Sequence, residues 1–71
     1  MDEYGELRDL VGAQGKLVVF MASLFQRAGV MKTSEFASLL ETFAQTVAET
    51  QPGEGAILAT WSAHVRAASG H

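Results

Sequence analysis

The first third of the chain repeats apolar residues at the spacing of an α-helix. With Leu7 at heptad position a, apolar side chains recur at positions a, d and e through three successive heptads. This pattern predicts an amphipathic helix over about residues 5–28, and Gly29 follows as a natural terminator. The repeating residues are Leu7, Met21 and Ala28 at position a, Leu10, Leu17 and Leu24 at position d, and Val11, Val18 and Phe25 at position e.

Two further helices are expected, over about residues 33–49 and 55–68. Thr33 or Ser34 can cap the first of them, and Pro52 with two glycines marks the turn between them. We therefore predict one all-α domain over residues 1–71, with a long hairpin of the first two helices, a shorter third helix and a frayed tail at 69–71. The predicted core residues are Phe25, Phe36, Leu39, Leu40, Phe43, Val47, Ile57, Trp61 and Val65.

The middle of the first helix is apolar on nearly every side. Val19 and Phe20 fall outside the a/d/e stripe, and a helix of this kind is normally covered all round. Two shorter helices cover one side only, and a cysteine-free chain of 71 residues has no disulfide to stabilise a small core. We therefore expect a homodimer to complete the bundle. Its predicted interface comprises Leu10, Gln14, Leu17, Val18, Val19, Phe20, Met21 and Leu24.

Gln14 and the glycines of the first helix leave alternatives open. Gln14 stands at position a, where a polar residue can fix the register of a dimer by bonding to Gln14 of the second copy. It can equally lie in water near the helix end. Gly15, Ala22 and Gly29 form a row of small residues that favours close packing, although a kink or a helix that begins after Gly15 would also explain the glycines.

Several chemical functions are disfavoured by spacing and charge. The segment Gly12–Lys16 lacks the spacing and the hydroxyl of a phosphate-binding loop, and the apolar run at 17–25 is about half the length of a membrane span. No acid has ligand spacing to His64, so we expect no enzyme, no metal and no cofactor. The net charge is −3, four acids lie in the first nine residues, and five basic residues are scattered singly, which argues against nucleic acid as a partner.

The sequence thus predicts a non-enzymatic helical interaction module, such as an adaptor, a regulator or an assembly subunit. Its expected partner is a second copy of itself, with another protein as a further partner, and its expected location is the cytoplasm. Two alternatives remain: a DNA-binding regulator with a helix-turn-helix-like hairpin at 24–40, and a small-ligand or metal site near Trp61 and His64.

Overall fold

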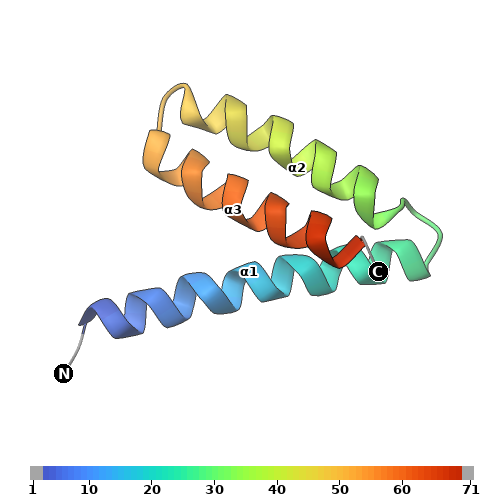
Figure 1. Cartoon of the computed structure of the whole chain (residues 1–71), viewed down its shortest axis with the longest axis horizontal. Helices are drawn as coiled ribbons and strands as arrows, with labels where there is room; N and C mark the ends of the chain where they lie inside the picture. Colours follow the sequence, from blue (N-terminus) through green and yellow to red (C-terminus); the bar gives the residue numbers. More distant parts are fainter. Residues whose placement is uncertain (1–2, 70–71) are drawn as a thin grey trace.

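The computed structural model describes residues 3–69, and three helices account for nearly all of them (Figure 1). They are α1 at Glu3–Arg27, α2 at Thr33–Ala48 and α3 at Pro52–Ser69. The residues described contain no strand, so the all-α prediction is confirmed. The third helix is not the shortest, because α3 has 18 residues and α2 has 16. Of the predicted frayed tail, Ser69 ends α3 and residues 70–71 lie outside the described part.

The end of α1 is a hydrogen-bonded stop centred on Gly29. Gly29 has a φ of 75°, a left-handed conformation that glycine adopts without a steric penalty. The backbone N–H of Val30 donates to the carbonyl of Phe25 at 2.8 Å, and that of Gly29 donates to the carbonyl of Gln26 at 3.1 Å. These two bonds form a Schellman motif, and the predicted role of Gly29 as terminator is confirmed.

The start of α2 is capped from α1 and not by its own residues. Lys32 occupies the N-cap position without a side-chain bond, so the expected cap by Thr33 or Ser34 is not formed. Instead, the backbone N–H of the buried Thr33 donates to Oε1 of Gln26 at 2.7 Å. This bond crosses the turn and ties the first N–H of α2 to the last turn of α1.

Replacing Gln26 by alanine is expected to destabilise the fold by about 1 kcal/mol, because it removes this cap. Chemical denaturation followed by circular dichroism would measure the loss. Gln45→Ala, at an exposed position of α2, is the matched control and should change stability by less than about 0.5 kcal/mol. Equal losses for the two variants would contradict a capping role for Gln26.

The third helix begins three residues earlier than predicted. Pro52 is its first residue, a position where the missing N–H of proline has no helical partner to lose. The N–H of Gly55 donates to the carbonyl of Gln51 at 3.0 Å, so the helix already runs through both glycines. The break between α2 and α3 is therefore shorter than Pro52 and the two glycines predict.

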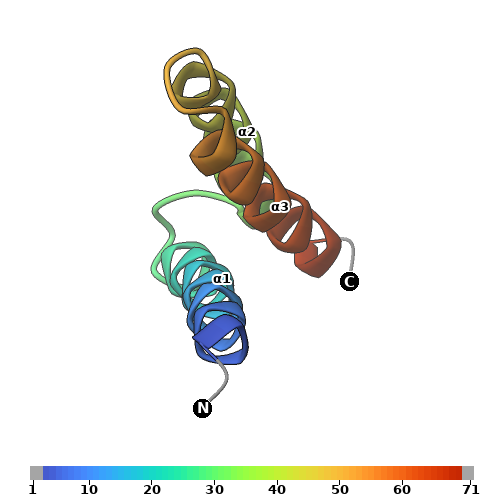
Figure 2. The same ribbon diagram turned by 90° about the vertical axis from the view of Figure 1, so that its left-hand side faces the viewer.

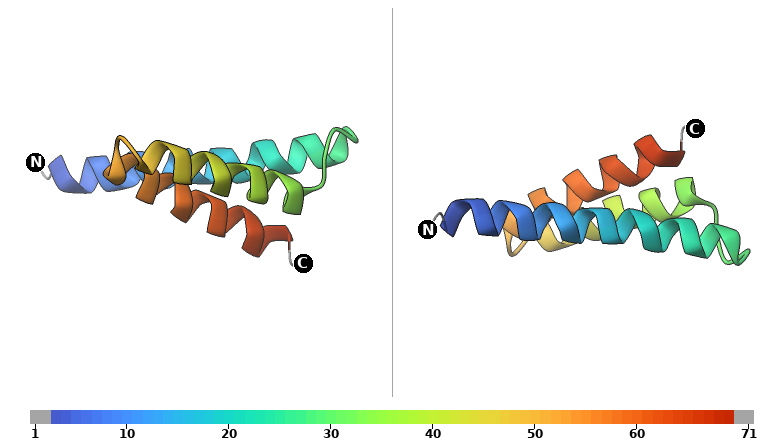
Figure 3. Two further views of the ribbon diagram at one scale, coloured as in Figure 1. Left: turned by 90° about the horizontal axis from the view of Figure 1, so that it is seen from above. Right: turned by 90° about the horizontal axis from the view of Figure 1, so that it is seen from below.

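The closest pairing in the structure is between α2 and α3, which lie antiparallel and side by side (Figures 1 and 3). Small residues form this seam: Ala37, Ala44 and Gly55 are buried, and Ser62 donates from Oγ to the carbonyl of Ala37 at 3.0 Å. The predicted hairpin of the first two helices is therefore not the tightest unit, because small side chains let α2 and α3 approach more closely.

The core of the single chain is small. Ala22, Ala37 and Val65, one residue from each helix, form the buried cluster, and Val65 is its only large fully buried side chain among the residues described. The radius of gyration is 13.0 Å, compared with about 11 Å for a compact domain of this length. Three helices thus enclose little volume and leave much of their surface open.

Candidate interaction surface

One side of α1 packs on its own chain through small and β-branched residues. Ala22 belongs to the core cluster, Val18 and Val19 lie against it, and Gly15 is buried beneath the indole of Trp61. A β-carbon at Gly15 would come within 2.7 Å of Cδ1 of Trp61. Close packing within the same chain therefore explains Gly15 and Ala22 of the predicted row, whereas Gly29 is exposed and serves as the terminator of α1.

Replacing Gly15 by alanine is expected to cost about 1–2 kcal/mol of stability. The added methyl group overlaps the rigid indole of Trp61, and this overpacking outweighs the better helix propensity of alanine. Gly12→Ala is the matched control, because a β-carbon there meets nothing within 4 Å, and it should gain about 0.5–1 kcal/mol. Thermal and chemical unfolding of both variants measures the contrast, and a stabilising effect at both positions would contradict the packing described.

The opposite side of α1 is left largely exposed by the described residues of the chain. Leu17 is 55% exposed and Phe20 is 58% exposed, although both lie in the middle of the helix. We call this set of exposed apolar residues the outer stripe of α1: Leu7, Leu10, Leu17, Phe20, Met21 and Leu24. Of the predicted interface residues, Val18 and Val19 do not belong to it, because they are half-buried against the core of their own chain.

A second exposed apolar strip lies on α2. Leu39 is 60% exposed and Phe43 is 56% exposed, so these two residues are not part of the core of the single chain. Ile57, another predicted core residue, is also exposed. On α2, alanines and not Leu39 or Phe43 face α3, and on α3 the buried Gly55 and Ser62, and not Ile57, lie in the seam with α2. Of the other predicted core residues, Val65 is buried and Phe25, Phe36, Leu40, Val47 and Trp61 are half-buried.

The exposed residues of α1 and α2 lie on the same side of the molecule. On α1, Gly15 faces α3 and Phe25 faces α2, where its ring lies 5.7 Å from that of Phe36. Around the circumference of α1, the order of side chains is Gly15, Phe25, Met21 and then Leu17, so Met21 and Leu17 lie beyond Phe25 as seen from Gly15.

On α2, the order of faces mirrors that of α1. Ala37 faces α3, Phe36 faces α1, and Phe43 and Leu39 lie beyond Phe36. Both strips therefore point away from α3. Figures 2 and 3 show that α3 covers one side of α1 and α2, and the strips lie on the other side. We call the outer stripe together with Leu39 and Phe43 the apolar face.

Gln14 lies within the outer stripe and is exposed in the single chain. It has a leucine one turn before it, at Leu10, and another one turn after it, at Leu17. Its amide is therefore the one polar group in the middle of this stripe, where a covering surface would have to supply a hydrogen-bond partner.

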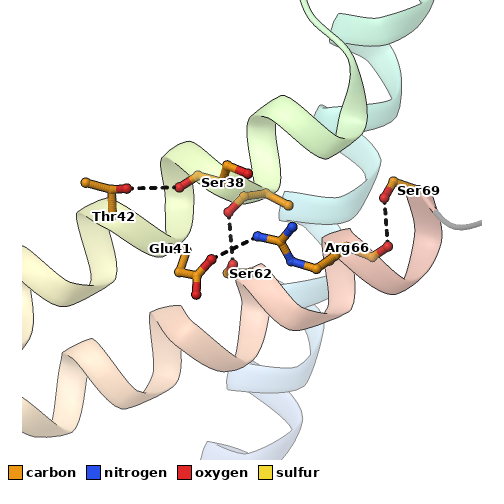
Figure 4. Close-up of polar contacts among 7 residues, drawn as sticks. Ser38, Glu41, Thr42, Ser62, Arg66 and Ser69 are labelled. Atoms are coloured by element: carbon orange, nitrogen blue, oxygen red, sulfur yellow. Dashed lines mark hydrogen bonds and ion pairs between the residues drawn. The ribbon is translucent and has the colours of Figure 1, made fainter.

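The polar groups of the α2–α3 side are largely bonded to one another (Figure 4). Nη2 of Arg66 donates to Oε2 of Glu41 at 2.9 Å across the two helices, beside a shallow depression that both residues line. Thr42 and Ser69 donate to carbonyls of their own helices. This side offers a satisfied ion pair and no cluster of converging reactive groups among those drawn.

Within the described residues, the side chain of His64 forms no hydrogen bond and no ion pair. His64 is exposed on α3, whereas Trp61, three residues earlier, is half-buried on Gly15. Among residues 3–69 there is no group of three or more histidine, aspartate or glutamate side chains that could hold a metal ion. Within the same residues, no helix combines the length and the apolarity needed to cross a bilayer.

Comparison with known proteins adds no relative. No family model matches the chain, and no curated protein sequence and no solved structure shows significant similarity to it.

Proposed function

We propose that the protein is a non-enzymatic interaction module that acts as a homodimer through its apolar face. One observation supports this proposal: among the described residues, the core contains one large fully buried side chain, whereas eight large apolar side chains are exposed on one side. Monomeric proteins expose scattered apolar residues, but a contiguous patch of this kind typically marks an interaction site.

The area of the chain supports a partner of about its own size. Its accessible surface is 5239 Å², whereas a compact monomer of 7.6 kDa would expose about 4300 Å². The excess of about 900 Å² is close to the roughly 800 Å² that each partner buries in a standard protein interface. A second copy, pairing through the same face, would remove this excess from both chains at once.

The proposed role is that of a small adaptor, regulator or assembly subunit in the cytoplasm. The lack of cysteine fits a reducing compartment, and the dimer would present the α3 helices on its outside. Another protein would then bind to surfaces other than the apolar face, since the second copy covers that face.

Sedimentation equilibrium at micromolar concentrations tests the proposal. We expect a species of twice the 7.6 kDa chain mass, with helicity that falls as the protein is diluted. A fully helical monomer throughout this range would overturn the homodimer. Salt-dependent retention on DNA would instead favour a nucleic-acid regulator, and its absence at low salt would count against that alternative.

A further inference from the structure

We infer that two copies of the chain pair with their α1 helices antiparallel, so that α1 and α2 of both copies form a four-helix core. This inference rests on the proposed homodimer and adds its arrangement. Three features of the chain carry it: the position of α2 beside the outer stripe, the distribution of charge along α1, and the order of residues within the stripe.

The position of α2 selects the direction of pairing. A two-fold axis perpendicular to α1 makes the helices antiparallel and places both copies of α2 on the same flank, next to each other. Leu39 and Phe43 then meet the second α2 and are covered. A two-fold axis along α1 makes the helices parallel and sends the two α2 helices to opposite flanks. Leu39 and Phe43 would then stay in water, at a cost that the antiparallel arrangement avoids.

The distribution of charge along α1 also favours antiparallel pairing. Within α1, residues 3–9 contain three acids and one arginine, which gives this segment a formal charge of −2. Residues 10–27 contain Lys16 and Arg27 and no acid, which gives +2. Parallel helices would set like charges against each other, whereas antiparallel helices set the acidic end of one copy against the basic end of the other. The helix dipoles are also opposed favourably in the antiparallel pair.

The residues of the outer stripe then define a register. Matching position a with position d places Leu7 against Leu24 of the second copy, and Leu10 against Met21 of the second copy. Gln14 lies against Leu17 of the second copy, next to the two-fold axis, where the two Gln14 amides come close to each other.

The residues at heptad position g, along one edge of the stripe, are compatible with the same register. Glu6 lies beside Arg27 of the second copy, which pairs opposite charges. Ala13 lies beside Phe20 of the second copy, so that a small residue accommodates a large one. In the single chain both Glu6 and Arg27 are exposed, and neither forms an ion pair within the described residues.

Cysteine cross-linking tests the direction. The chain has no cysteine, so Leu7→Cys and Leu24→Cys each introduce one thiol at a position exposed in the single chain. In the antiparallel pair, the two copies of either residue are about 25 Å apart, beyond the reach of a disulfide. We expect a covalent dimer only when the two variants are mixed and oxidised. Cross-linking of each variant by itself would show a parallel pair and overturn the inference while leaving the homodimer intact.

A charge exchange tests the register independently. Glu6→Arg and Arg27→Glu should each weaken the dimer about tenfold at low salt, because each creates two like-charge contacts per dimer. The double variant restores both pairs and should recover the affinity to within about twofold. The single-variant effects should shrink in 1 M salt, where surface charges are screened.

The outcomes separate the two levels of the proposal. A wild-type dimer whose double variant stays as weak as the singles would overturn the antiparallel register but not the homodimer. A wild-type chain that sediments as a helical monomer would overturn the homodimer, and the arrangement with it. Circular dichroism of every variant confirms that the helices are formed before affinities are compared.

Discussion

Replacing Leu17 by aspartate is expected to raise the dissociation constant of the homodimer by more than about a hundredfold. Leu17 is central in the outer stripe and is 55% exposed in the single chain. In the dimer both copies would lie near the two-fold axis, so two carboxylates would be removed from water without a cationic partner. An uncompensated buried charge costs several kcal/mol, and about 1.4 kcal/mol corresponds to a factor of ten in affinity.

The measurement is sedimentation equilibrium of the variant beside wild type at the same concentrations. Ser23→Asp is the matched control, because it adds the same charge to an exposed position about 120° around α1 from Leu17, outside the outer stripe, and should leave the dimer within about twofold. Since Leu17 contributes nothing to the buried cluster of its own chain, the variant monomer should keep its helices. An unchanged dimer in Leu17→Asp would show that the outer stripe is not the interface.

Replacing Gly55 by alanine is expected to destabilise the fold by about 3 kcal/mol. A β-carbon at Gly55 would lie 2.5 Å from Cβ, 2.7 Å from Cα and 2.8 Å from the backbone N of Ala48. Two of these atoms are backbone, so no side-chain rotation relieves the overlap and α2 and α3 must separate. A 71-residue chain is typically stable by only about 4–10 kcal/mol, so this is a large share of the total.

Chemical denaturation at a fixed protein concentration measures the loss, since the stability of a dimer depends on concentration. Gly53→Ala is the control: it lies in the same first turn of α3, and a β-carbon there meets nothing within 4 Å. Combining Gly55→Ala with Ala48→Gly should recover only part of the loss, because Cα and N of residue 48 stay in place. Full stability in Gly55→Ala would contradict the close α2–α3 approach.

The helices and their termini were largely predictable because the interactions that make them are local. The heptad stripe located α1 within two residues at its start and one at its end, and Gly29 ended it as expected. The cap of α2 was not predictable in this way. Gln26 and Thr33 belong to different elements, and only the path of the turn brings the amide oxygen to the N–H.

The exposed apolar surface was predictable in part. Five of the eight residues predicted for the interface belong to the outer stripe, and Gln14 is exposed among them. Val18 and Val19 turn toward their own chain. The sequence predicts Leu39 and Phe43 in the core, because large apolar residues at helical spacing are usually buried. A second feature of the sequence predicts their exposure: Ala37 and Ala44 form a row of small residues on another face of the same helix. That face can approach a neighbouring helix more closely than the face with Leu39 and Phe43 can.

The sequence by itself determined that this protein consists of three helices, where the first one ends, and that one chain has more apolar surface than it can bury. Those properties follow from residue spacing and backbone preference along a single stretch of chain. Only the tertiary structure decided which apolar face is inside. That choice depends on how closely two backbones can approach, and here Gly15 and Gly55 with the seam alanines admit the closest approach. The large side chains are left on the far side for that reason.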